Sequence, residues 1–326
     1  MTVDAARASE NGRPGSTEPA TATTSADAAE RFEAARSRLT GLAYRLLGSW
    51  AEAEDVVQDA WPRWASVAAT GGIDNADAYL TTIVTRLALT ALDSARVRRE
   101  QYVGPWLPEP VSTRDDPTLG AERAEALDLA TLLLLERLSG PERAAVVLRE
   151  AFAYDYTSLA EVLSTTEAAA RQLVSRGRRA LDGGRRQPVS PADRDRLLAA
   201  FVSAAQSGDL AALEAVLVPD AVAVSDGGGV VSAARRPVRG AEQVARFVLG
   251  VLEKFGRGVR SIPVIANGET AFLAVTDEPD PQPVALWSLD IGADGVRGVH
   301  IVRAPDKLAR VTAQALSQIG DASGRL

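Results

Sequence analysis

Residues 167–186 include the side-chain types that proteins use to recognise nucleic acid. This segment holds six arginines and two acidic residues, although the whole chain has a formal net charge of -7. Guanidinium groups bind phosphates, and arginine or glutamine also match guanine or adenine edges in the major groove. The candidate DNA contacts are Arg171, Gln172, Ser175, Arg176, Arg178 and Arg179. We expect the first three to contact base edges and the last three to hold phosphates.

Two short helices joined by a tight turn are expected to position these side chains. Apolar residues recur at helical spacing in two stripes: Tyr156, Leu159, Val162 and Leu163, then Ala169, Leu173, Gly177 and Leu181. Helix starts are predicted by three pairs with capping-box spacing: Ser139 with Glu142, Ser158 with Glu161, and Ser164 with Glu167. The pattern predicts a helix-turn-helix whose second helix enters the major groove. The alternative is an ordinary helical hairpin with a solvated arginine face.

Asp226 and His300 are the candidate general bases. The chain has no cysteine and His300 is its single histidine, which excludes disulfides, thiolate metal sites and multi-histidine metal centres. Asp226 precedes three glycines, where an aspartate most often closes a turn through backbone amides. His300 alternates with Val299 and Ile301, as a structural histidine on a strand does. We therefore expect no catalytic residue, no metal and no cofactor.

The first third of the chain predicts a compact helical bundle. Residues 1–25 have almost no large apolar side chain and predict a disordered tail. Apolar stripes then predict a helix that ends at Gly48, a second helix that begins with Ser49 and Glu52, and a third from about Ala76. No apolar run approaches a membrane span and no signal-peptide pattern is present, so we expect a cytoplasmic protein with no membrane contact.

The C-terminal third mixes helices and strands. Helices are predicted at 191–207, 210–217 and 240–255, and strands near 221–225, 260–265, 271–276, 283–290 and 296–303. Helices followed by successive antiparallel strands predict an α+β domain. Between the helical segments, residues 104–110 contain three prolines, which predict an extended linker. Trp106 and Leu107 are its apolar anchors, docked either on the C-terminal domain or as a local cap on the first bundle.

Several segments resemble one protein family. Residues 41–64 (GLAYRLLGSWAEAEDVVQDAWPRW) resemble the polymerase-binding helix of bacterial sigma factors, and residues 153–181 resemble their promoter-binding domain. The motifs YVGPWLPEP (102–110), SDGGG (225–229) and APDKL (304–308) are similar to the signatures of extracytoplasmic-function sigma factors with a SnoaL-like C-terminal domain, the sigma-J-like subgroup. The resemblance implies a protein that binds core RNA polymerase and promoter DNA and is controlled by its own C-terminal domain.

The resemblance also implies roles for residues of the first bundle. Polymerase contacts are expected from the acidic helix and its apolar support: Glu52, Asp55, Gln58, Asp59 and Trp61. Contacts to the minus-ten element are expected from the arginines of the third helix: Arg86, Arg96, Arg98 and Arg99. A solvated helix face is the alternative for both groups. Pro62 departs from the family pattern and predicts that the second helix kinks or ends near Ala60.

Contacts between the C-terminal domain and the rest of the chain are the third implied set. We expect them from the three motifs, at Trp106, Leu107, Pro108, Asp226, Gly227, Gly228, Gly229, Pro305, Asp306, Lys307 and Leu308. Lys307 and Asp306 are expected to pair with charged surfaces of the sigma domains. Val230 and Ala304 depart from the family pattern, so control by this domain is expected to be weakened or altered.

The expected organisation is multidomain, with two all-α sigma domains and a C-terminal α+β SnoaL-like domain of cone shape. The assignment is a tail at 1–25, region 2 at 26–102, a linker at 103–120, region 4 at 121–187 and the SnoaL-like domain at 188–326. Two alternatives stay open. One is a helix-turn-helix regulator with a ligand-sensing domain, and the other is a fused cyclase or isomerase that uses Asp226 or His300.

Overall fold

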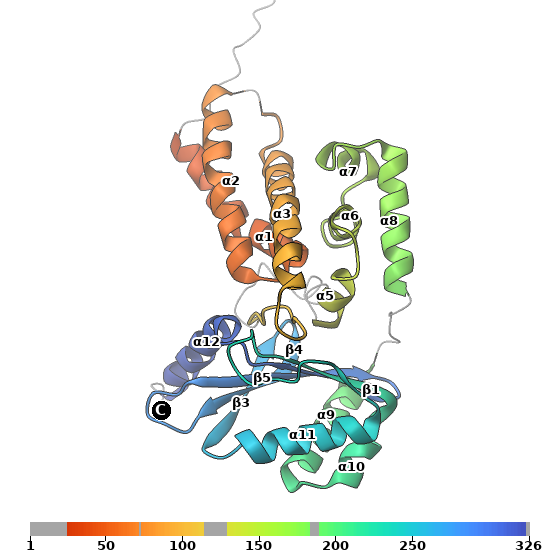
Figure 1. Ribbon diagram of the computed structural model, residues 1–326. Coiled ribbons are helices and arrows are strands. Elements are labelled where there is room, and N and C mark those ends of the chain that lie inside the picture. The colour runs from red at the N-terminus through yellow and green to blue at the C-terminus, as the bar shows by residue number, and fades with distance from the viewer. Residues whose placement is uncertain (1–24, 72, 114–128, 183–188, 324–326) are drawn as a thin grey trace, which may run out of the picture.

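The computed structural model describes residues 25–71, 73–113, 129–182 and 189–323. A helical half stands on an α+β domain that has one mixed sheet (Figure 1). Within the described ranges, no helix is both long and apolar enough to cross a membrane. The predicted tail, residues 114–128 between the helical groups, and residues 183–188 fall almost wholly outside these ranges.

Three long helices form the first group: α1 (Ser25–Leu47), α2 (Trp50–Thr70) and α3 (Ala76–Glu100). Ser49 begins α2 as predicted, because its hydroxyl accepts a hydrogen bond from the Glu52 amide at 3.4 Å. Asn75 caps α3 in the same way through the Ala78 amide. Phe32 of α1, Trp64 of α2 and Leu80 of α3 belong to the same cluster of buried side chains, so the apolar stripes of the three helices make one core.

Of the two outcomes predicted for Pro62, a kink or an end of α2 near Ala60, the end is wrong. The helix continues through Pro62 to Thr70. Pro62 and Gln58 are both exposed, so water can solvate the Gln58 carbonyl that loses its amide partner. Trp64 and Ala68 are buried beyond the proline, and their packing holds the last turns in place.

The second group contains α5 (Leu129–Leu135), α6 (Gly140–Ala151), α7 (Tyr156–Val162) and α8 (Glu167–Asp182). The predicted capping box of Ser139 and Glu142 is present at the start of α6. The other two capping predictions are wrong, since Asp155 caps α7 and the Thr166 hydroxyl accepts from an amide in the first turn of α8. Asp155 precedes the expected Ser158, and Thr166 follows the expected Ser164. Each lies directly before the first residue of its helix, where its side-chain oxygen reaches the free amides of the first turn.

The predicted helix-turn-helix is confirmed as α7 and α8, but the buried stripe of α8 differs from the expected one. Ala170, Val174 and Gly177 face the core, whereas Leu173 and Leu181 are half-buried. A side chain at position 177 would collide with Val146 of α6. Glycine is therefore required for the close packing of α8 on α6.

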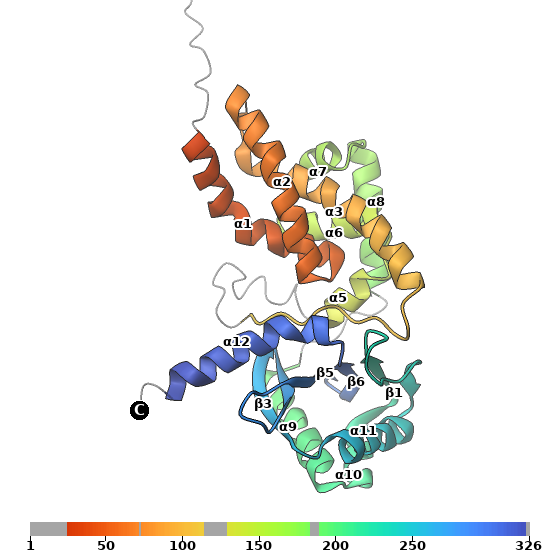
Figure 2. The ribbon, with the colours of Figure 1, turned by 60° about the vertical axis from the view of Figure 1, so that its left-hand side comes forward.

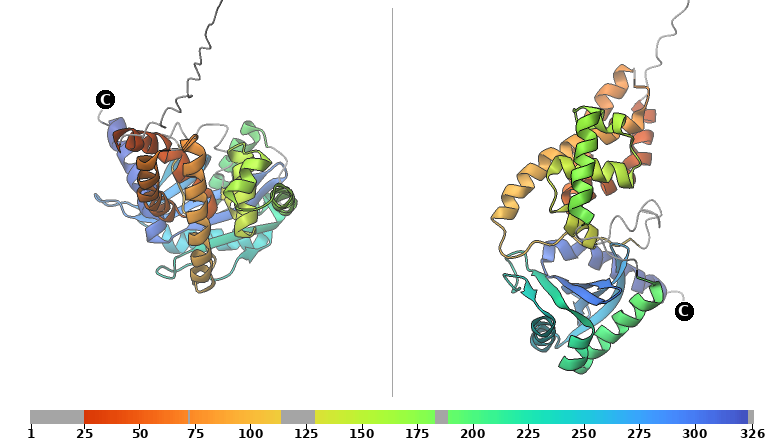
Figure 3. Two further views of the ribbon diagram at one scale, coloured as in Figure 1. Left: turned by 90° about the horizontal axis from the view of Figure 1, so that it is seen from above. Right: turned by 90° about the vertical axis from the view of Figure 1, so that its right-hand side faces the viewer.

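The two helical groups share one hydrophobic core. Buried side chains from α1, α2 and α3 are continuous with those of α6, α7 and α8. Figure 3 shows α7 and α8 lying beside the first group in views from above and from the side. The helix-turn-helix thus packs against the bundle that precedes it.

The C-terminal domain begins with helices α9 (Pro191–Ser207) and α10 (Leu210–Ala215) and later adds α11 (Ala241–Phe255). Its strands are β1 (Leu217–Asp226), β2 (Val238–Arg239), β3 (Val259–Ala266), β4 (Glu269–Thr276), β5 (Pro283–Gly292) and β6 (Gly295–Val302). The sheet order is β2-β1-β6-β5-β4-β3. The predicted antiparallel succession is confirmed for β3 to β6, while β1 joins β6 in parallel. This is the predicted α+β class.

Helix α12 (Pro305–Ser323) is an element that the sequence analysis does not predict. It lies on the face of the sheet opposite α9, α10 and α11 (Figures 1 and 2). The two faces have separate cores. One joins α9, α10 and α11 to the sheet, and the other joins α12, the sheet and Leu107 of the linker.

Candidate functional site

The candidate DNA contacts of α8 are all exposed on one helix. Arg171 forms an ion pair with Glu167 and lies 4.8 Å from the centre of the Tyr156 ring. The aromatic ring and the ion pair orient this guanidinium, while Gln172 and Ser175 project from the same helix. Their exposure fits the predicted contacts to base edges, which stay a prediction.

The predicted phosphate contacts have acidic neighbours on α6. Arg176 lies 3.0 Å from Glu142, and the Arg178 Nε donates to Glu150 at 2.8 Å. The Arg179 Nε donates to the Ser175 carbonyl at 3.3 Å. Exposed ion pairs of this kind contribute at most about 1 kcal/mol, so phosphates can replace these carboxylates at little cost.

Arg86 of α3, a predicted contact to the minus-ten element, binds the helix-turn-helix in this structure. Its guanidinium donates to the carbonyls of Val162 and Glu161 at 3.2 and 3.0 Å, and to the Ser164 hydroxyl at 2.9 Å. These acceptors are the last turn of α7 and the start of its turn to α8, where free carbonyls favour a cation.

The other α3 arginines also have partners within the protein. The Arg96 guanidinium donates to the Leu138 carbonyl at 2.7 Å. Arg98 pairs with Glu52, and Arg99 binds both Glu136 and the carbonyl that ends α1. In this arrangement Arg86, Arg96 and Arg99 join the two helical groups, whereas Arg98 joins α3 to α2. Contact of these guanidinium groups with DNA requires their release.

The predicted polymerase face of α2 is mostly free of such contacts. Asp55, Gln58 and Asp59 are exposed. Trp61 is half-buried and meets Phe32 edge to face at 5.1 Å, so it supports the helix from behind. Glu52 differs from these three exposed residues, because it is half-buried and forms an ion pair with Arg98.

The linker passes between the helical half and the C-terminal domain, along α12 (Figure 2). Leu107 is 0% exposed and lies in the core formed by α12 and the sheet. Its amide donates to Asp226 Oδ2 at 2.8 Å, and its carbonyl accepts from Lys307 Nζ at 2.7 Å. One linker residue thus binds the SDGGG and APDKL motifs at once.

Asp226 and Lys307 form the centre of this contact. We call the contact the linker clamp and define it as Tyr102, Trp106, Leu107, Asp226 and Lys307. Lys307 Nζ lies 2.7 Å from Asp226 Oδ2, and the Tyr102 hydroxyl donates to Oδ1 at 2.6 Å. Asp226 is fully buried. Burial lowers the pKa of Lys307, and the nearby Asp226 carboxylate opposes that shift.

Trp106 fills the space between the two halves. Its ring lies 3.6 Å from the Arg99 guanidinium carbon and 4.3 Å from Lys307 Nζ. A Cβ on Gly48 would stand 2.6 Å from this ring, so the end of α1 requires glycine here. Pro108 is buried directly after the clamp.

The glycines of the SDGGG motif let the linker approach closely. Gly228 and Gly229 have φ of 66° and 73°, which other residues rarely adopt. Cβ atoms there would lie 3.1 Å from Ala304 and 3.2 Å from Val103. The Gly228 amide also donates to Asp226 Oδ1 at 3.0 Å. The predicted turn-closing bond of Asp226 is therefore present, within a larger set of bonds.

The APDKL motif is the first turn of α12. Pro305 and Asp306 are exposed, and Leu308 is 0% exposed in the same core as Leu107. The expected pairing of Lys307 with an acidic surface of the sigma domains is wrong, because it pairs with Asp226 of its own domain. Burial selects that partner, since a buried ammonium group requires a nearby counter-charge. Val230 is 78% exposed and Ala304 is fully buried.

Residues 31–98 match the sigma-70 region 2 family, and residues 128–181 match the sigma-70 region 4 family. The ECF RNA polymerase sigma factor SigJ of Mycobacterium tuberculosis (strain ATCC 25618 / H37Rv) is 43% identical over 249 residues, which are 73% of this chain and 78% of SigJ. This chain belongs to the ECF RNA polymerase sigma factor family. The probable ECF RNA polymerase sigma factor SigI of M. tuberculosis (strain CDC 1551 / Oshkosh) is 31% identical over 288 residues, or 87% of this chain and 95% of SigI.

The crystal structure of M. tuberculosis SigJ, described as an extracytoplasmic function sigma factor, has a TM-score of 0.69 and 34% identity to this chain. It covers 86% of this chain and 98% of its own. In this ECF sigma factor, α1 to α3 belong to region 2 and α5 to α8 to region 4, and the C-terminal α+β domain is SnoaL-like. The region 2 match excludes a simple helix-turn-helix regulator.

Sequence reasoning missed several residues by which the C-terminal domain of this ECF sigma factor contacts region 2. The Asn267 side chain donates to the Tyr44 hydroxyl at 2.7 Å, and that hydroxyl donates to the Glu109 carbonyl at 2.6 Å. Arg310 of α12 lies 2.9 Å from Glu54 of α2. The dipeptide after β3, Asn267 with Gly268, signals a hairpin turn, but nothing in the sequence signals its distant partner.

Glu109 has a further role that the sequence did not reveal. Its carboxylate accepts from the Trp50 and Ala51 amides at 2.8 and 3.3 Å, and from the Ser49 hydroxyl at 3.2 Å. It thereby caps the N-terminus of α2 from the linker. Burial raises the pKa of Glu109, and the two backbone hydrogen bonds oppose this shift.

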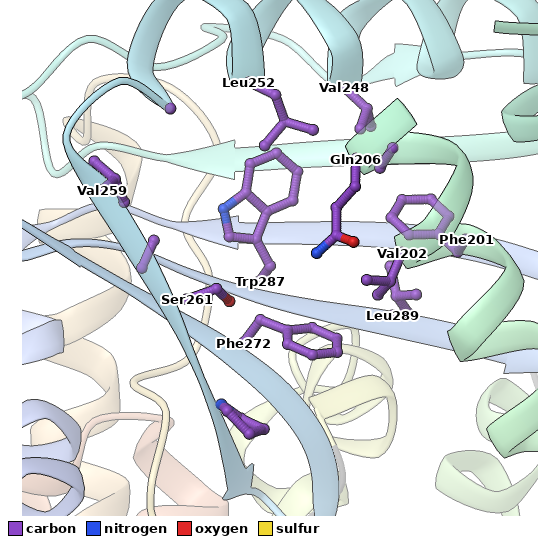
Figure 4. A pocket seen from close by; sticks show the side chains of 14 residues that line it. Phe201, Val202, Gln206, Val248, Leu252, Val259, Ser261, Phe272, Trp287 and Leu289 are labelled. Atoms are coloured by element: carbon purple, nitrogen blue, oxygen red, sulfur yellow. The ribbon is translucent and has the colours of Figure 1, made fainter. Parts of the chain in front are cut away.

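The SnoaL-like domain has a pocket on the face that carries α9 and α11 (Figure 4). Asp226 is bound in the linker clamp on another part of the domain, and neither it nor His300 is among the residues that line this pocket. His300 is buried within β6 beside Ser288 of β5. In the described part of the chain, no group of three or more His, Asp or Glu side chains is placed to hold a metal ion.

Proposed function

We propose that the SnoaL-like domain of this ECF sigma factor holds regions 2 and 4 in a closed arrangement and thereby controls promoter binding. In this closed arrangement the buried side chains of regions 2 and 4 form one hydrophobic core. The observation that carries the proposal is the linker clamp, in which Asp226 and Lys307 bind the linker residue Leu107 from both sides.

Binding both promoter elements requires the closed arrangement to open. The minus-ten and minus-35 elements are separated by about 25 base pairs, or ~85 Å of B-form DNA at 3.4 Å per base pair. Domains of the size of regions 2 and 4 have a radius of gyration of about 11 Å. Two such domains in one core cannot reach both elements. Arg86 must also leave the turn of the helix-turn-helix.

The SnoaL-like domain contacts both regions, which favours their closed arrangement. Leu133 of α5 packs on the core formed by α12 and the sheet. On the region 2 side, Asn267 binds Tyr44 and Arg310 binds Glu54. When regions 2 and 4 separate, the SnoaL-like domain loses its contacts with at least one of them. The free energy of these contacts therefore opposes the separation.

We assign polymerase binding to the exposed acidic face of α2, formed by Asp55, Gln58 and Asp59. The minus-35 element is assigned to the exposed face of α8, and the minus-ten element to the arginines of α3 once these are released. Their exposure and charge support this division. Asp226 serves in the linker clamp, and we assign it no catalytic role.

The test is promoter binding by holoenzyme assembled from core polymerase and the full chain. Leu107→Ala removes the buried anchor of the linker, and Asn267→Ala removes a contact to Tyr44. Both variants are expected to increase the fraction of promoter bound at a fixed holoenzyme concentration, because the closed arrangement is less stable. Val230→Ala is the matched control on the exposed end of the SDGGG loop and should change nothing.

Polymerase binding is measured separately with the same proteins. Asp55→Ala is expected to weaken co-elution with core polymerase, whereas Leu107→Ala leaves it intact. Unchanged promoter binding by both Leu107→Ala and Asn267→Ala, with polymerase binding intact, would overturn control by the SnoaL-like domain.

A further inference from the structure

A hollow in the SnoaL-like domain has the form of a small-molecule site. It has a volume of about 330 Å³ and lies between α9, α11 and the strands β3, β4 and β5. This is within the range of roughly 300–1,000 Å³ that small-molecule sites occupy. Figure 4 shows Trp287 in the middle of the hollow, with Leu252 of α11 on one side and Phe272 of β4 on the other.

The lining of the hollow is apolar and holds no ionisable side chain. Polar side-chain groups come from Gln206, Ser261 and the Trp287 indole, and the other lining side chains are hydrocarbon or glycine. A charged molecule would lose its hydration here without gaining a counter-charge. General acid–base chemistry has no titratable group at this surface. The hollow is therefore suited to binding a neutral molecule without transforming it.

Aromatic rings define the shape that fits. Phe201, Phe272 and Trp287 all line the hollow, and the last two are half-buried although they belong to the inner face of a sheet. Rings stack on flat ligands at favourable offset or edge geometries. We propose that this hollow is a sensory site for a neutral, flat, mostly apolar molecule that makes one or two hydrogen bonds to Gln206 or Ser261.

The same strands connect the hollow to the linker clamp. Side chains alternate between the faces of a strand. Ser261 and Pro263 line the hollow, whereas Ile262 between them packs in the core that holds Leu107. In β5, Trp287 lines the hollow and Leu286 packs in that core. One thickness of sheet thus separates the proposed ligand from the anchor of the linker.

Ligand binding changes the linker clamp through these strands. Close-packed interiors transmit small displacements, and a ligand beside Trp287 and Phe272 bears on the strands that support Leu107. This second step rests on the proposed control by the SnoaL-like domain, whereas the binding site itself does not. The two are tested by different measurements.

Binding is tested with a matched pair of fluorescent probes on the full chain. N-phenyl-1-naphthylamine is neutral, and 8-anilino-1-naphthalenesulfonate has the same rings with an added sulfonate. We expect the neutral probe to bind at least about tenfold more tightly. The titrations are done at ~0.5 M salt, so that screening removes the effect of the net negative charge of the protein.

Two variants fill the hollow from different walls. Ala274→Trp acts from β4, and Ala205→Trp acts from the half-buried surface of α9. Each is expected to weaken binding of the neutral probe by about tenfold or more. Ala309→Trp adds the same side chain on the exposed face of α12 and is the control. Equal binding by Ala205→Trp and the unaltered chain, or tighter binding of the sulfonate probe, would overturn the site.

Coupling is tested by hydrogen exchange in the linker at saturating neutral probe. The Leu107 and Val111 amides both donate to side chains of the SnoaL-like domain, so their exchange reports the linker clamp. We expect exchange of residues 102–113 to change at least about twofold on probe binding. Probe binding without any change would retain the site and reject the coupling. Concentration-dependent dimerisation that Ala205→Trp abolishes would instead identify the hollow as a surface for a second copy.

Discussion

Asp226 is the residue on which the linker clamp depends most. It is fully buried, pairs with Lys307 and accepts from the Tyr102 hydroxyl and the Leu107 and Gly228 amides. Removal of one charge from a buried pair leaves the other without compensation. Asp226→Asn is therefore expected to lower the free energy of unfolding by about 3 kcal/mol, as measured by urea denaturation.

Two further variants separate the charge pair from simple loss of packing. Lys307→Met in the Asp226→Asn background removes the uncompensated charge and should recover part of the loss. Asp220→Asn, at an exposed position on the same strand, should have almost no effect. A loss no larger for Asp226→Asn than for Asp220→Asn would show that the pair contributes nothing.

Glu109 predicts a pH dependence of stability. Its folded-state pKa is raised above the ordinary 4.5 by burial, so the folded state binds the proton more tightly than the unfolded state does. The contribution of Glu109 to stability therefore falls as pH rises from 4.5 through the folded-state pKa. Glu109→Gln lacks this titration. Its melting temperature relative to the unaltered chain should rise between pH 4.5 and 7.5, and a relative fall would show that the backbone hydrogen bonds outweigh burial.

At the scale of elements, α8 is expected to divide its work between base edges and phosphates. Arg171→Ala should reduce discrimination between promoter and random DNA by about 1 to 3 kcal/mol. Arg179→Ala should weaken binding to both DNAs and lower the slope of affinity against salt by ~1. Both are measured with holoenzyme over a range of salt concentrations. Equal losses from the two variants on both DNAs would contradict this division.

Helices α2 and α3 illustrate how tertiary contacts decide local questions. The sequence predicts that Pro62 kinks or ends α2, but the helix continues to Thr70 because the proline is exposed and buried Trp64 holds the turns beyond it. For α3 the sequence predicts arginines that face DNA, and in the closed arrangement they bind carbonyls and carboxylates of the protein. The helix propensity of one residue changes stability by about 3 kcal/mol at most. The packing of buried side chains such as Trp64 outweighs this local preference.

At the scale of the whole molecule, the closed arrangement predicts a large change in distance. The chain has no cysteine, so Thr70→Cys at the end of α2 and Ala180→Cys on α8 provide two specific labelling sites. Both positions are exposed. Energy transfer between the dyes should fall when holoenzyme binds promoter DNA, because the two regions then separate.

A labelled Leu107→Ala variant provides the comparison for that experiment. Its free chain should already show lower energy transfer, since the linker has lost its buried anchor. Unchanged transfer on promoter DNA would mean that regions 2 and 4 bind DNA without separating, contrary to the geometry of a bipartite promoter.

The sequence by itself determined the elements and the family. The 3.6-residue stripes, the capping pair Ser139 with Glu142 and the alternating strands were sufficient for most helices and for β3 to β6, because hydrophobic periodicity is a local property. The motifs at 102–110, 225–229 and 304–308 marked the linker and the two segments that meet it. They did not reveal α12, because a proline followed by charged residues fits either a turn or a helix start.

Only the tertiary structure decided how these segments meet. The bond from Asn267 to Tyr44, the cap that Glu109 places on α2 and the binding of Arg86 to the turn after α7 each join residues far apart in the sequence. Such contacts depend on where whole domains dock. Docking is set by the shape and burial of complete surfaces, which no short pattern of residues encodes.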